Sequence, residues 1–578
     1  MRRLLILVFL VLASLVQLGR AQQAAAPRPA EPQKFRITGT VVNSVTRQPL
    51  GRIEVALSPS DRSDEAEQAV TGEDGRFRFD NLGRGKYALS AHGHGFIAQA
   101  YQQHGQYSTA VAVGPDLVSE NLVFALVPEA SISGSVVDDE NEPVRGGEAI
   151  LFQRQQDEGK TITQVRSRAP IDDQGHYHFG HLDPGTYFVA ISAQPWYAQD
   201  TPVTPQVLHE TLEAPATPDA PREDPGPDAT TSEPPSPSPL DVVYPTTFYP
   251  SATDPESAAS TVLHPGERAT ADVNLRAVPG LYVTVHNPYP DATTPMTLVL
   301  QQRLFDDNPV GVQVRNQRTR PGSITVGGVP PGHFVLSVRT FTGNEWASLN
   351  REIDISANTD IDAASIAGSN VAVQGIVRAS TGIPVGASVR FVSHESGEAF
   401  DVVVNDKGDF QTQRTVSAPT SYSLTVVNAG RMLLQSLSAV GAEVAGHTVT
   451  LPRSGAVQLT VNMSEGSGRV DGVVLRGDKP ASETMVLLVP PNPDRNPSLF
   501  RRDQSDSDGS FTLREILPGR YTVVAIEKGW DLDWQNPAVL QPYLARGEVV
   551  DVAANRSYKI SLKLPDSDTA TTSVPPTQ

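Results

Sequence analysis

One phrase recurs along the sequence and most constrains how the chain can fold. Its clearest copy runs from Asp508 to Tyr521, with an Asp-Gly start, alternating apolar residues and a Gly-x-Tyr end. Further copies run from Asp74 to Tyr87, from Gln174 to Tyr187, from Gly322 to Phe334 and from Lys407 to Tyr422. In four of the five copies the first Gly precedes the second by ten residues. Copies spaced by about 90–140 residues are too far apart for a solenoid, so they predict repeated whole domains.

The first copy shows what the phrase is expected to do. Gly75 should supply the positive-φ position of a tight turn, because glycine lacks the Cβ that makes this region costly. Phe77 and Phe79 stand two residues apart, so both side chains should point inward from one strand. Gly85 should open the next turn. Tyr87 should bury its ring and bond its hydroxyl to nearby backbone, as in the tyrosine corner of immunoglobulin sandwiches.

An alternating strand pattern, Ile/Val-x-Gly-x-Val, precedes each phrase. Glycine occupies the same place in four copies: Gly39, Gly134, Gly375 and Gly472. Val283 replaces it in the third copy, and a Pro follows eight to twelve residues later in every copy. Period-two alternation, 45 Gly, 48 Pro and almost no helix signal predict an all-β chain. Each repeat is expected to be an antiparallel β-sandwich of about seven strands.

The repeats divide the chain into five modules joined by short linkers. The predicted segments are a signal peptide at 1–21, a linker at 22–33, module 1 at 34–128, module 2 at 129–277, a degenerate module 3 at 278–368, module 4 at 369–464, module 5 at 465–565 and a tail at 566–578. Module 2 contains a Pro-rich, acidic insertion at 201–239. Because such a segment cannot bury a core, we predict that it is disordered, and we predict the same of the polar tail.

The N-terminus and the composition indicate where the protein works. A basic start, an apolar run from Leu4 to Leu18 and small residues before a cleavage position after Ala21 are typical of a secretory signal peptide. The run is shorter than a membrane-spanning helix requires. The chain has no Cys, which excludes disulfides and thiolate metal sites. Its net charge of −19 disfavours nucleic acid and membrane surfaces as partners. We therefore expect an exported protein that is periplasmic, cell-surface or secreted, with no membrane span in the mature chain.

The Ile/Val-x-Gly-x-Val strand, the Pro after it and the Asp-Gly…Gly-x-Tyr phrase resemble the carboxypeptidase regulatory-like domain. This family is similar to the transthyretin-like domain of metallocarboxypeptidases, to Cna-B-type surface-protein repeats and to starch-binding-like sandwiches. The resemblance is best in modules 1, 2 and 5. It implies tandem prealbumin-like sandwiches in a bacterial exported protein. It implies no activity, because sandwiches of this kind host many roles.

The sequence indicates neither a catalytic set nor a metal site. No stretch is free to form the large α/β domain of a metallocarboxypeptidase, and no Gly-x-Ser-x-Gly elbow is present. His176, His178 and His181 could reach one ion, but without an acidic or thiol partner they are better interpreted as solvent-facing strand residues. The run from Asp503 to Asp508 resembles part of a calcium loop but lacks its terminal bidentate Glu. We therefore predict a non-enzymatic protein without cofactor or metal.

Aromatic residues recur just after the strand that the Tyr of the phrase begins. We predict that they bind a ligand: Tyr101, Tyr107, Trp196, Tyr197, Trp530, Trp534 and Tyr543. Flat rings beside amide side chains suit sugar recognition, and Tyr and Trp serve protein interfaces equally well. The alternative is satellite packing at the sandwich edges, since large rings are more often buried than exposed.

The predicted function is therefore that of a binding or scaffold protein of the bacterial envelope. Its possible partners are a polysaccharide, bound through the aromatic loops, or an envelope protein. One alternative is an accessory subunit that positions a partner hydrolase or peptidase. Another is a purely structural surface spacer or adhesin.

Overall fold

The structure is a computed structural model. It describes residues 34–62, 65–198, 240–286, 296–305, 308–312, 314, 316–320, 322–342, 345–362, 369–379, 382–394, 399–416 and 419–565. The predicted signal peptide (1–21), linker (22–33), insertion (201–239) and tail (566–578) lie outside the described residues.

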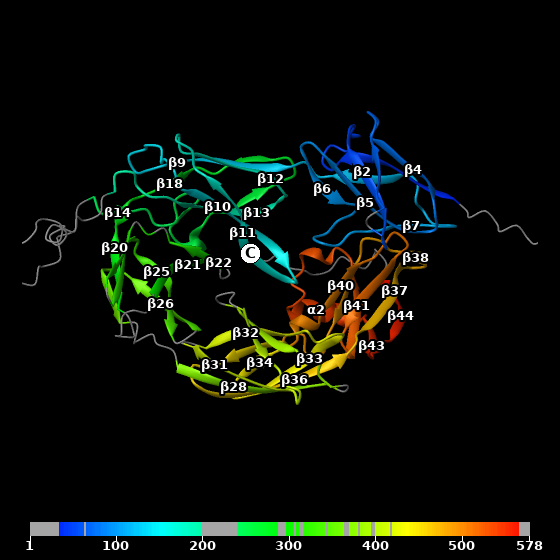
Figure 1. Ribbon diagram of the computed structural model, residues 1–578. Helices are drawn as coiled ribbons and strands as arrows, with labels where there is room; N and C mark the ends of the chain where they lie inside the picture. Colours follow the sequence, from blue (N-terminus) through cyan, green and yellow to red (C-terminus); the bar gives the residue numbers. More distant parts are fainter. Residues whose placement is uncertain are drawn as a thin grey trace, which may run out of the picture.

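The described strands pair into five groups, each built on two facing sheets, which we call domains 1 to 5. The prediction of an all-β chain of tandem sandwiches is confirmed. The five domains follow one another around a ring, and domain 5 lies beside domains 1 and 2 (Figure 1). No helix among the described residues is long and apolar enough to cross a membrane.

The first two domains contain the following strands. Domain 1 has β1 (Phe35–Asn43), β2 (Glu54–Pro59), β3 (Glu67–Val70), β4 (Arg76–Leu82), β5 (Gly85–Gly93), β6 (Phe96–Ala100), β7 (Val111–Val113) and β8 (Leu122–Leu126). Domain 2 has β9 (Ala130–Val137), β10 (Glu148–Asp157), β11 (Lys160–Pro170), β12 (His176–Leu182), β13 (Gly185–Ser192), β14 (Val242–Val243), β15 (Thr247–Phe248), β16 (Thr261–Leu263), β17 (Arg268–Thr270), β18 (Val273–Asn274) and β19 (Val278–Pro279), with the 3-10 helix η1 (Pro255–Ser257).

The remaining three domains complete the chain. Domain 3 has β20 (Leu281–His286), β21 (Met296–Leu304), β22 (Asn308–Gly311), β23 (Asn316–Arg320), β24 (Ser323–Val329), β25 (Gly332–Thr342), β26 (Glu345–Ile355) and β27 (Thr359–Asp362). Domain 4 has β28 (Ser369–Arg378), β29 (Ser388–Ser393), β30 (Ala399–Val403), β31 (Asp409–Val416), β32 (Thr420–Val427), β33 (Met432–Val440), β34 (Glu443–Ala445), β35 (Thr448–Leu451) and β36 (Gly455–Glu465). Domain 5 has β37 (Gly468–Arg476), β38 (Lys479–Pro480), β39 (Met485–Val489), η3 (Pro497–Leu499), β40 (Arg501–Gln504), β41 (Ser510–Ile516), β42 (Gly519–Ile526), η4 (Gly529–Asp531), α2 (Pro537–Leu544), β43 (Glu548–Val552) and β44 (Ser557–Leu564).

The sandwiches of domains 1, 2 and 5 follow one plan with seven strand positions. In domain 1 one sheet has the order β4-β1-β8 and the other has the order β3-β2-β5-β6. Strand β7 pairs with the same edge of β5 as β6 does, further along, so the two share one position. Domains 3 and 4 add edge strands to this plan, namely β23 in domain 3 and β33 and β34 in domain 4.

Every domain also contains parallel pairing, whereas the sequence predicted antiparallel sandwiches. The parallel pairs are β1 with β8, β9 with both β17 and β18, β20 with β27, β28 with β36 and β37 with β44. Period-two alternation marks the face a residue takes but not the neighbour of its strand, so the sequence could not reveal this. Because the first and last strands run side by side in the same direction, the chain enters each domain at one end and leaves it at the other.

The two repeated sequence patterns meet across the sheet. A Cβ at Gly39 would overlap the ring of Phe77, which faces it in the register of β1 and β4. The same close approach joins Gly134 to Tyr177, Gly375 to Phe410 and Gly472 to Phe511. In domain 3 Val283 faces Val326 instead, so both the glycine and the ring are replaced. The glycine is therefore needed because an aromatic ring lies on it.

The turn predicted at the start of the phrase is present, but its second Gly has a different role. Gly75 has a φ of 71°, as predicted for a tight turn. Gly85 begins β5 without a left-handed backbone, and the left-handed residues before it and before Gly519 are Asn81 (φ 61°) and Glu515 (φ 54°). The ring of the Tyr two residues later packs against this second Gly. A Cβ would lie 3.3 Å from the Tyr521 ring at Gly519 but 3.9 Å from the Tyr87 ring at Gly85, so room for the ring accounts for the second Gly in domain 5 and not in domain 1.

The tyrosine prediction is confirmed in domain 2, and in domain 1 the hydrogen bond is present although the Tyr87 ring is only half-buried. Tyr187 is fully buried, and its hydroxyl donates to the Asp183 carbonyl at 2.8 Å. The hydroxyl of Tyr87 donates to the Gly83 carbonyl at 3.0 Å. Phe334 is buried at the corresponding place in domain 3 and has no hydroxyl to donate.

We expect Tyr187→Phe to weaken domain 2 locally. Loss of the bond to Asp183 should lower the free energy of local opening by about 1–2 kcal/mol, because a part-buried carbonyl loses its donor. Amides of β13 should then exchange about 5–30 times faster in hydrogen-exchange mass spectrometry. Strand β25, whose Phe334 already lacks a hydroxyl, should be unchanged. Equal effects on both strands, or no effect on β13, would contradict the assignment.

Candidate functional site

Two of the seven predicted aromatic residues are core residues. Tyr101 is 9% exposed and packs edge-on against Phe124 at 5.6 Å in domain 1. Trp534 is 4% exposed, and its ring lies 4.8 Å from that of Phe500. With their faces covered, these rings offer no platform to a ligand, so the packing alternative holds for both.

Trp534 belongs to a second apolar layer on the outer face of domain 5. Strand β39 is buried along its whole length, because its sheet is covered on both sides. The cover is the segment that carries Trp530, Trp534 and α2, with Leu540 at its centre and Tyr543 at its margin. Asn536 caps α2 by accepting from the Ala538 amide at 3.0 Å. This segment forms because the sheet would otherwise expose an apolar face.

Aromatic rings from domains 1 and 5 meet where these two domains touch. His104 stacks on Trp530, with ring centroids 4.8 Å apart and an angle of 9°. Tyr107 lies 5.9 Å from the same indole. The guanidinium of Arg502 lies 4.8 Å from the Tyr107 ring centre, 5.8 Å from Trp530 and 5.6 Å from Trp534, a cation–π arrangement. Two predicted residues, Tyr107 and Trp530, are thus brought together, and their main partners here are His104 and Arg502.

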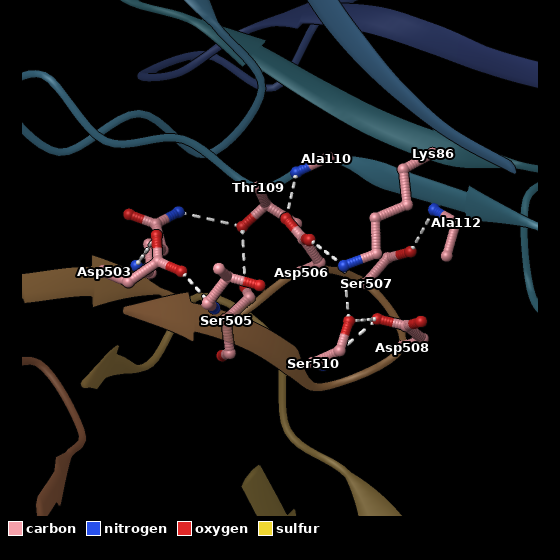
Figure 2. Close-up of polar contacts among 12 residues, drawn as sticks. Lys86, Thr109, Ala110, Ala112, Asp503, Ser505, Asp506, Ser507, Asp508 and Ser510 are labelled. Atoms are coloured by element: carbon pink, nitrogen blue, oxygen red, sulfur yellow. Dashed lines mark hydrogen bonds and ion pairs between the residues drawn. The ribbon is translucent and has the colours of Figure 1, made fainter. Parts of the chain in front are cut away.

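A polar contact continues the same interface along the free edge of β7 (Figure 2). The Lys86 ammonium lies 2.5 Å from Asp506 Oδ2 and 2.6 Å from the Ser510 hydroxyl. The Ala110 amide donates to Asp506 Oδ1 at 2.8 Å, and the Ser507 amide donates to the Ala110 carbonyl at 3.0 Å. The Ala112 amide donates to Ser507 Oγ at 2.8 Å. The segment from Asp506 to Ser510 therefore completes the hydrogen bonding of a strand edge in domain 1.

Glutamine and threonine side chains close the gap between these two contacts. Gln504 Nε2 donates to the Gln102 carbonyl at 2.7 Å and to Thr109 Oγ1 at 2.8 Å. Thr109 is buried, and its hydroxyl also lies within 3.4 Å of the Ser505 carbonyl. Buried polar groups of this kind are costly when unpaired, so the pairing favours one docking geometry.

Burial alters the two carboxyl groups beneath the interface. It raises the pKa of Asp503 to about 6, although the amides of Thr512 and Gln504 that bond to it favour its ionised form. Burial also raises the pKa of Asp506, against the opposing influence of Lys86. A charge pair removed from water adds little net stability but is costly to break on one side. The run that resembled a calcium loop therefore holds Lys86 and backbone amides.

Domain 5 is held a second time, by the β10–β11 hairpin of domain 2. A Cβ at Gly159, in the turn of this hairpin, would overlap the ring of Trp534. Asp533 accepts from Gln156 Nε2 at 2.8 Å and from the Thr161 amide and hydroxyl at 3.0 and 2.8 Å. The bond from Gln156, followed by those from Thr161, lowers the pKa of Asp533. The Gln535 amide donates to the Gly159 carbonyl at 3.1 Å.

Trp196 and Tyr197 lie apart from this interface. They follow β13, with Trp196 73% exposed and the two ring centroids 5.8 Å apart. A hydrogen bond to Tyr197 and burial raise the pKa of Tyr244, with burial the larger cause. The second module therefore presents one of its predicted rings to solvent.

The histidines considered for a metal site have separate protein partners. His178 Nδ1 lies 2.9 Å from Ser133 Oγ, and His181 Nδ1 lies 2.8 Å from Glu129. The sequence also holds a His-x-x-Glu spacing that motif reasoning missed, at His264 and Glu267. These two side chains bond to each other at 2.8 Å in a turn. No group of three such side chains among the described residues could share an ion.

We expect Gly159→Ala to loosen the docking of domain 5, because the added methyl group meets Trp534. Gly146→Ala is the matched control: Gly146 has a similar φ (75° against 82°), but its Cβ would meet nothing within 4 Å. Both variants should strain their turns by about 1–2 kcal/mol. Only Gly159→Ala should red-shift the tryptophan emission and speed amide exchange in α2. Equal behaviour of the two variants would show that the hairpin does not hold domain 5.

Residues 36–125 match the family model of the carboxypeptidase regulatory-like domain. No curated protein matches the chain. Among solved structures, the chain is similar to the Bacillus anthracis TIE protein (9% identity, 93% of this chain and 76% of that one, TM-score 0.15). It is also similar to GBS52, the minor pilin of Streptococcus agalactiae (10%, 42% and 96%, 0.20), and to BcpA, the major pilin subunit of Bacillus cereus (9%, 58% and 100%, 0.13). Scores this low carry no inference, and no comparison indicates an enzyme family. The first domain of this chain is therefore similar to the carboxypeptidase regulatory-like domain.

Proposed function

We propose that this protein is a non-enzymatic, exported scaffold of the bacterial envelope whose five sandwiches are held as a closed ring. The observation that carries the proposal is the docking of domain 5 on both domain 1 and domain 2. The contact of Lys86 with Asp506 joins residues 420 positions apart, and that of Thr161 with Asp533 joins residues 372 positions apart. Two independent contacts fix the relative orientation of domains that the linkers alone would leave variable.

A closed ring suits a scaffold better than it suits a spacer. A spacer gains reach from an extended row of domains, and closure gives up that reach. The signal-like N-terminus and the net charge of −19, which opposes self-association, favour an exported soluble protein. The loops that the ring holds in fixed positions are then available to a partner or a polysaccharide of the envelope.

An engineered disulfide tests the closure directly, because the natural chain has no Cys. Ala112 is buried between inward-facing Val111 and Val113, so its side chain faces domain 5. Its amide bonds to Ser507 Oγ at 2.8 Å, which places the two Cα atoms within about 7 Å, a span that a disulfide can bridge. Ala112→Cys with Ser507→Cys should crosslink under mild oxidation, detected by faster migration on a denaturing gel.

The controls separate closure from chance oxidation. Ala112→Cys with Val440→Cys, which is 72% exposed in domain 4, should stay reduced within the monomer. X-ray scattering of the natural chain should match that of the crosslinked chain. Scattering from an extended particle, together with no crosslink, would overturn the ring.

Carbohydrate binding through the aromatic loops is the second candidate, favoured by the exposed ring of Trp196. Trp196→Ala should lower the affinity for a bound glycan about tenfold, because one stacking contact is worth on the order of 1.4 kcal/mol. Trp196→Phe keeps a ring face and should retain most of the binding. An array of neutral and acidic glycans, followed by calorimetry on any ligand found, provides the measurement. If no glycan binds, the proposal of carbohydrate binding is contradicted and the proposal of a scaffold is unaffected.

A further inference from the structure

A pocket of about 430 Å³ lies at the junction of domains 1 and 5. Domain 5 forms most of it, from the end of β37, the residues on either side of Pro480 and the segment from Glu527 to Trp530. Domain 1 contributes His104, which also stacks on Trp530. The volume falls in the range of small-ligand sites, about 300–1,000 Å³.

The charges around the pocket leave an excess of cations. Arg476, Lys479 and Lys528 outnumber the two lining acids. Glu527 lies 2.8 Å from Arg476, and Glu483 lies 3.7 Å from His104, which is charged only when protonated. Lys479 and Lys528 also line the pocket, and neither makes an ion pair within the part of the chain that the structure describes. In a protein with a net charge of −19, two unpaired ammonium groups at one pocket favour an anionic occupant.

The backbone at the pocket is held in an uncommon conformation on two sides. Glu483 has a φ of 60° and Lys528 a φ of 51°, in the left-handed region that favours Gly and Asn. Lys528 immediately precedes η4, which carries Trp530. Residues other than Gly and Asn carry backbone strain at such positions because of their Cβ, and strain of this kind concentrates at functional sites.

The geometry points to this pocket as a binding site for an acidic sugar, a uronate unit of a polysaccharide. The ammonium groups of Lys479 and Lys528 bind the carboxylate, the edge of Trp530 contacts the apolar face of the sugar, and Ser482 lies beside the sugar hydroxyls. This assignment deepens the carbohydrate part of the proposed function and rests on it.

The same site links ligand binding to the shape of the molecule. Because His104 comes from domain 1 and the other lining residues come from domain 5, the pocket is complete only when the ring is closed. A ligand that binds the closed form better must shift the equilibrium toward closure. The acidic sugar is therefore expected to stabilise the ring.

The test uses the full mature chain, with trigalacturonate as the probe and its methyl ester as the uncharged match of the same shape. By calorimetry the acid should bind about ten times more tightly than the ester, the difference expected for one charge-assisted hydrogen bond. Added salt should reduce this preference. Equal binding of acid and ester, or binding of neither, would overturn the assignment.

Substitutions locate the site. Lys479→Gln and Lys528→Asn should each lower the affinity for trigalacturonate about tenfold. Asn tolerates the left-handed backbone, so Lys528→Asn should keep the natural melting temperature. Lys559→Gln, at an exposed position of β44 in the same domain, is the matched control and should bind trigalacturonate normally. Loss of binding in Trp196→Ala with none in the lysine variants would place the ligand elsewhere and reject this pocket.

The link to closure gives a separate readout. Trigalacturonate should speed crosslinking of Ala112→Cys with Ser507→Cys, and the Lys528→Asn background should abolish that effect. If the disulfide forms equally fast with and without trigalacturonate, the coupling fails while the ring scaffold stands. If it never forms, the ring proposal itself fails.

Discussion

The contact between β7 of domain 1 and the segment from Asp506 to Ser510 determines whether the five domains form a closed ring or an extended row. Parallel pairing of the first and last strands sends the chain through each domain from one end to the other. Repeated five times, that rule alone produces a row of domains. The curvature of the row must therefore be held by contacts between its ends, and the covered edge of β7 provides two of them.

The closure combines contacts that are modest singly. The pair of Lys86 and Asp506 is partly buried, so its desolvation offsets much of its attraction. The stacking of His104 on Trp530 adds on the order of 1 kcal/mol. Such contacts are sufficient because they are intramolecular. The β10–β11 hairpin of domain 2 contacts Trp534 at the same time. Once one contact forms, the other is made at a high effective concentration.

The sequence could predict what depends on neighbours in the chain. Phe77, Gly39 and Tyr187 follow from period-two alternation and from the steric needs of a ring, so the sandwich fold could be predicted. The parallel pairs could not, because alternation does not specify which strands are adjacent. Nor could the closure, since Lys86 and Asp506 are separated by 420 residues and no sequence pattern links the two. The sequence predicted that Trp530 binds a ligand, and in the structure His104 of the same chain stacks on its ring.

His104 connects the three levels of this structure. It stacks on Trp530, pairs with Glu483 and lines the cationic pocket, so one side chain takes part in closure, in charge balance and in the candidate binding site. Its ring covers one face of an indole that sequence reasoning assigned to a ligand. Closure of the five domains therefore does not compete with ligand binding at the pocket, because it places His104 in the pocket wall. Shape and recognition in this protein depend on the same few contacts between its first and last domains.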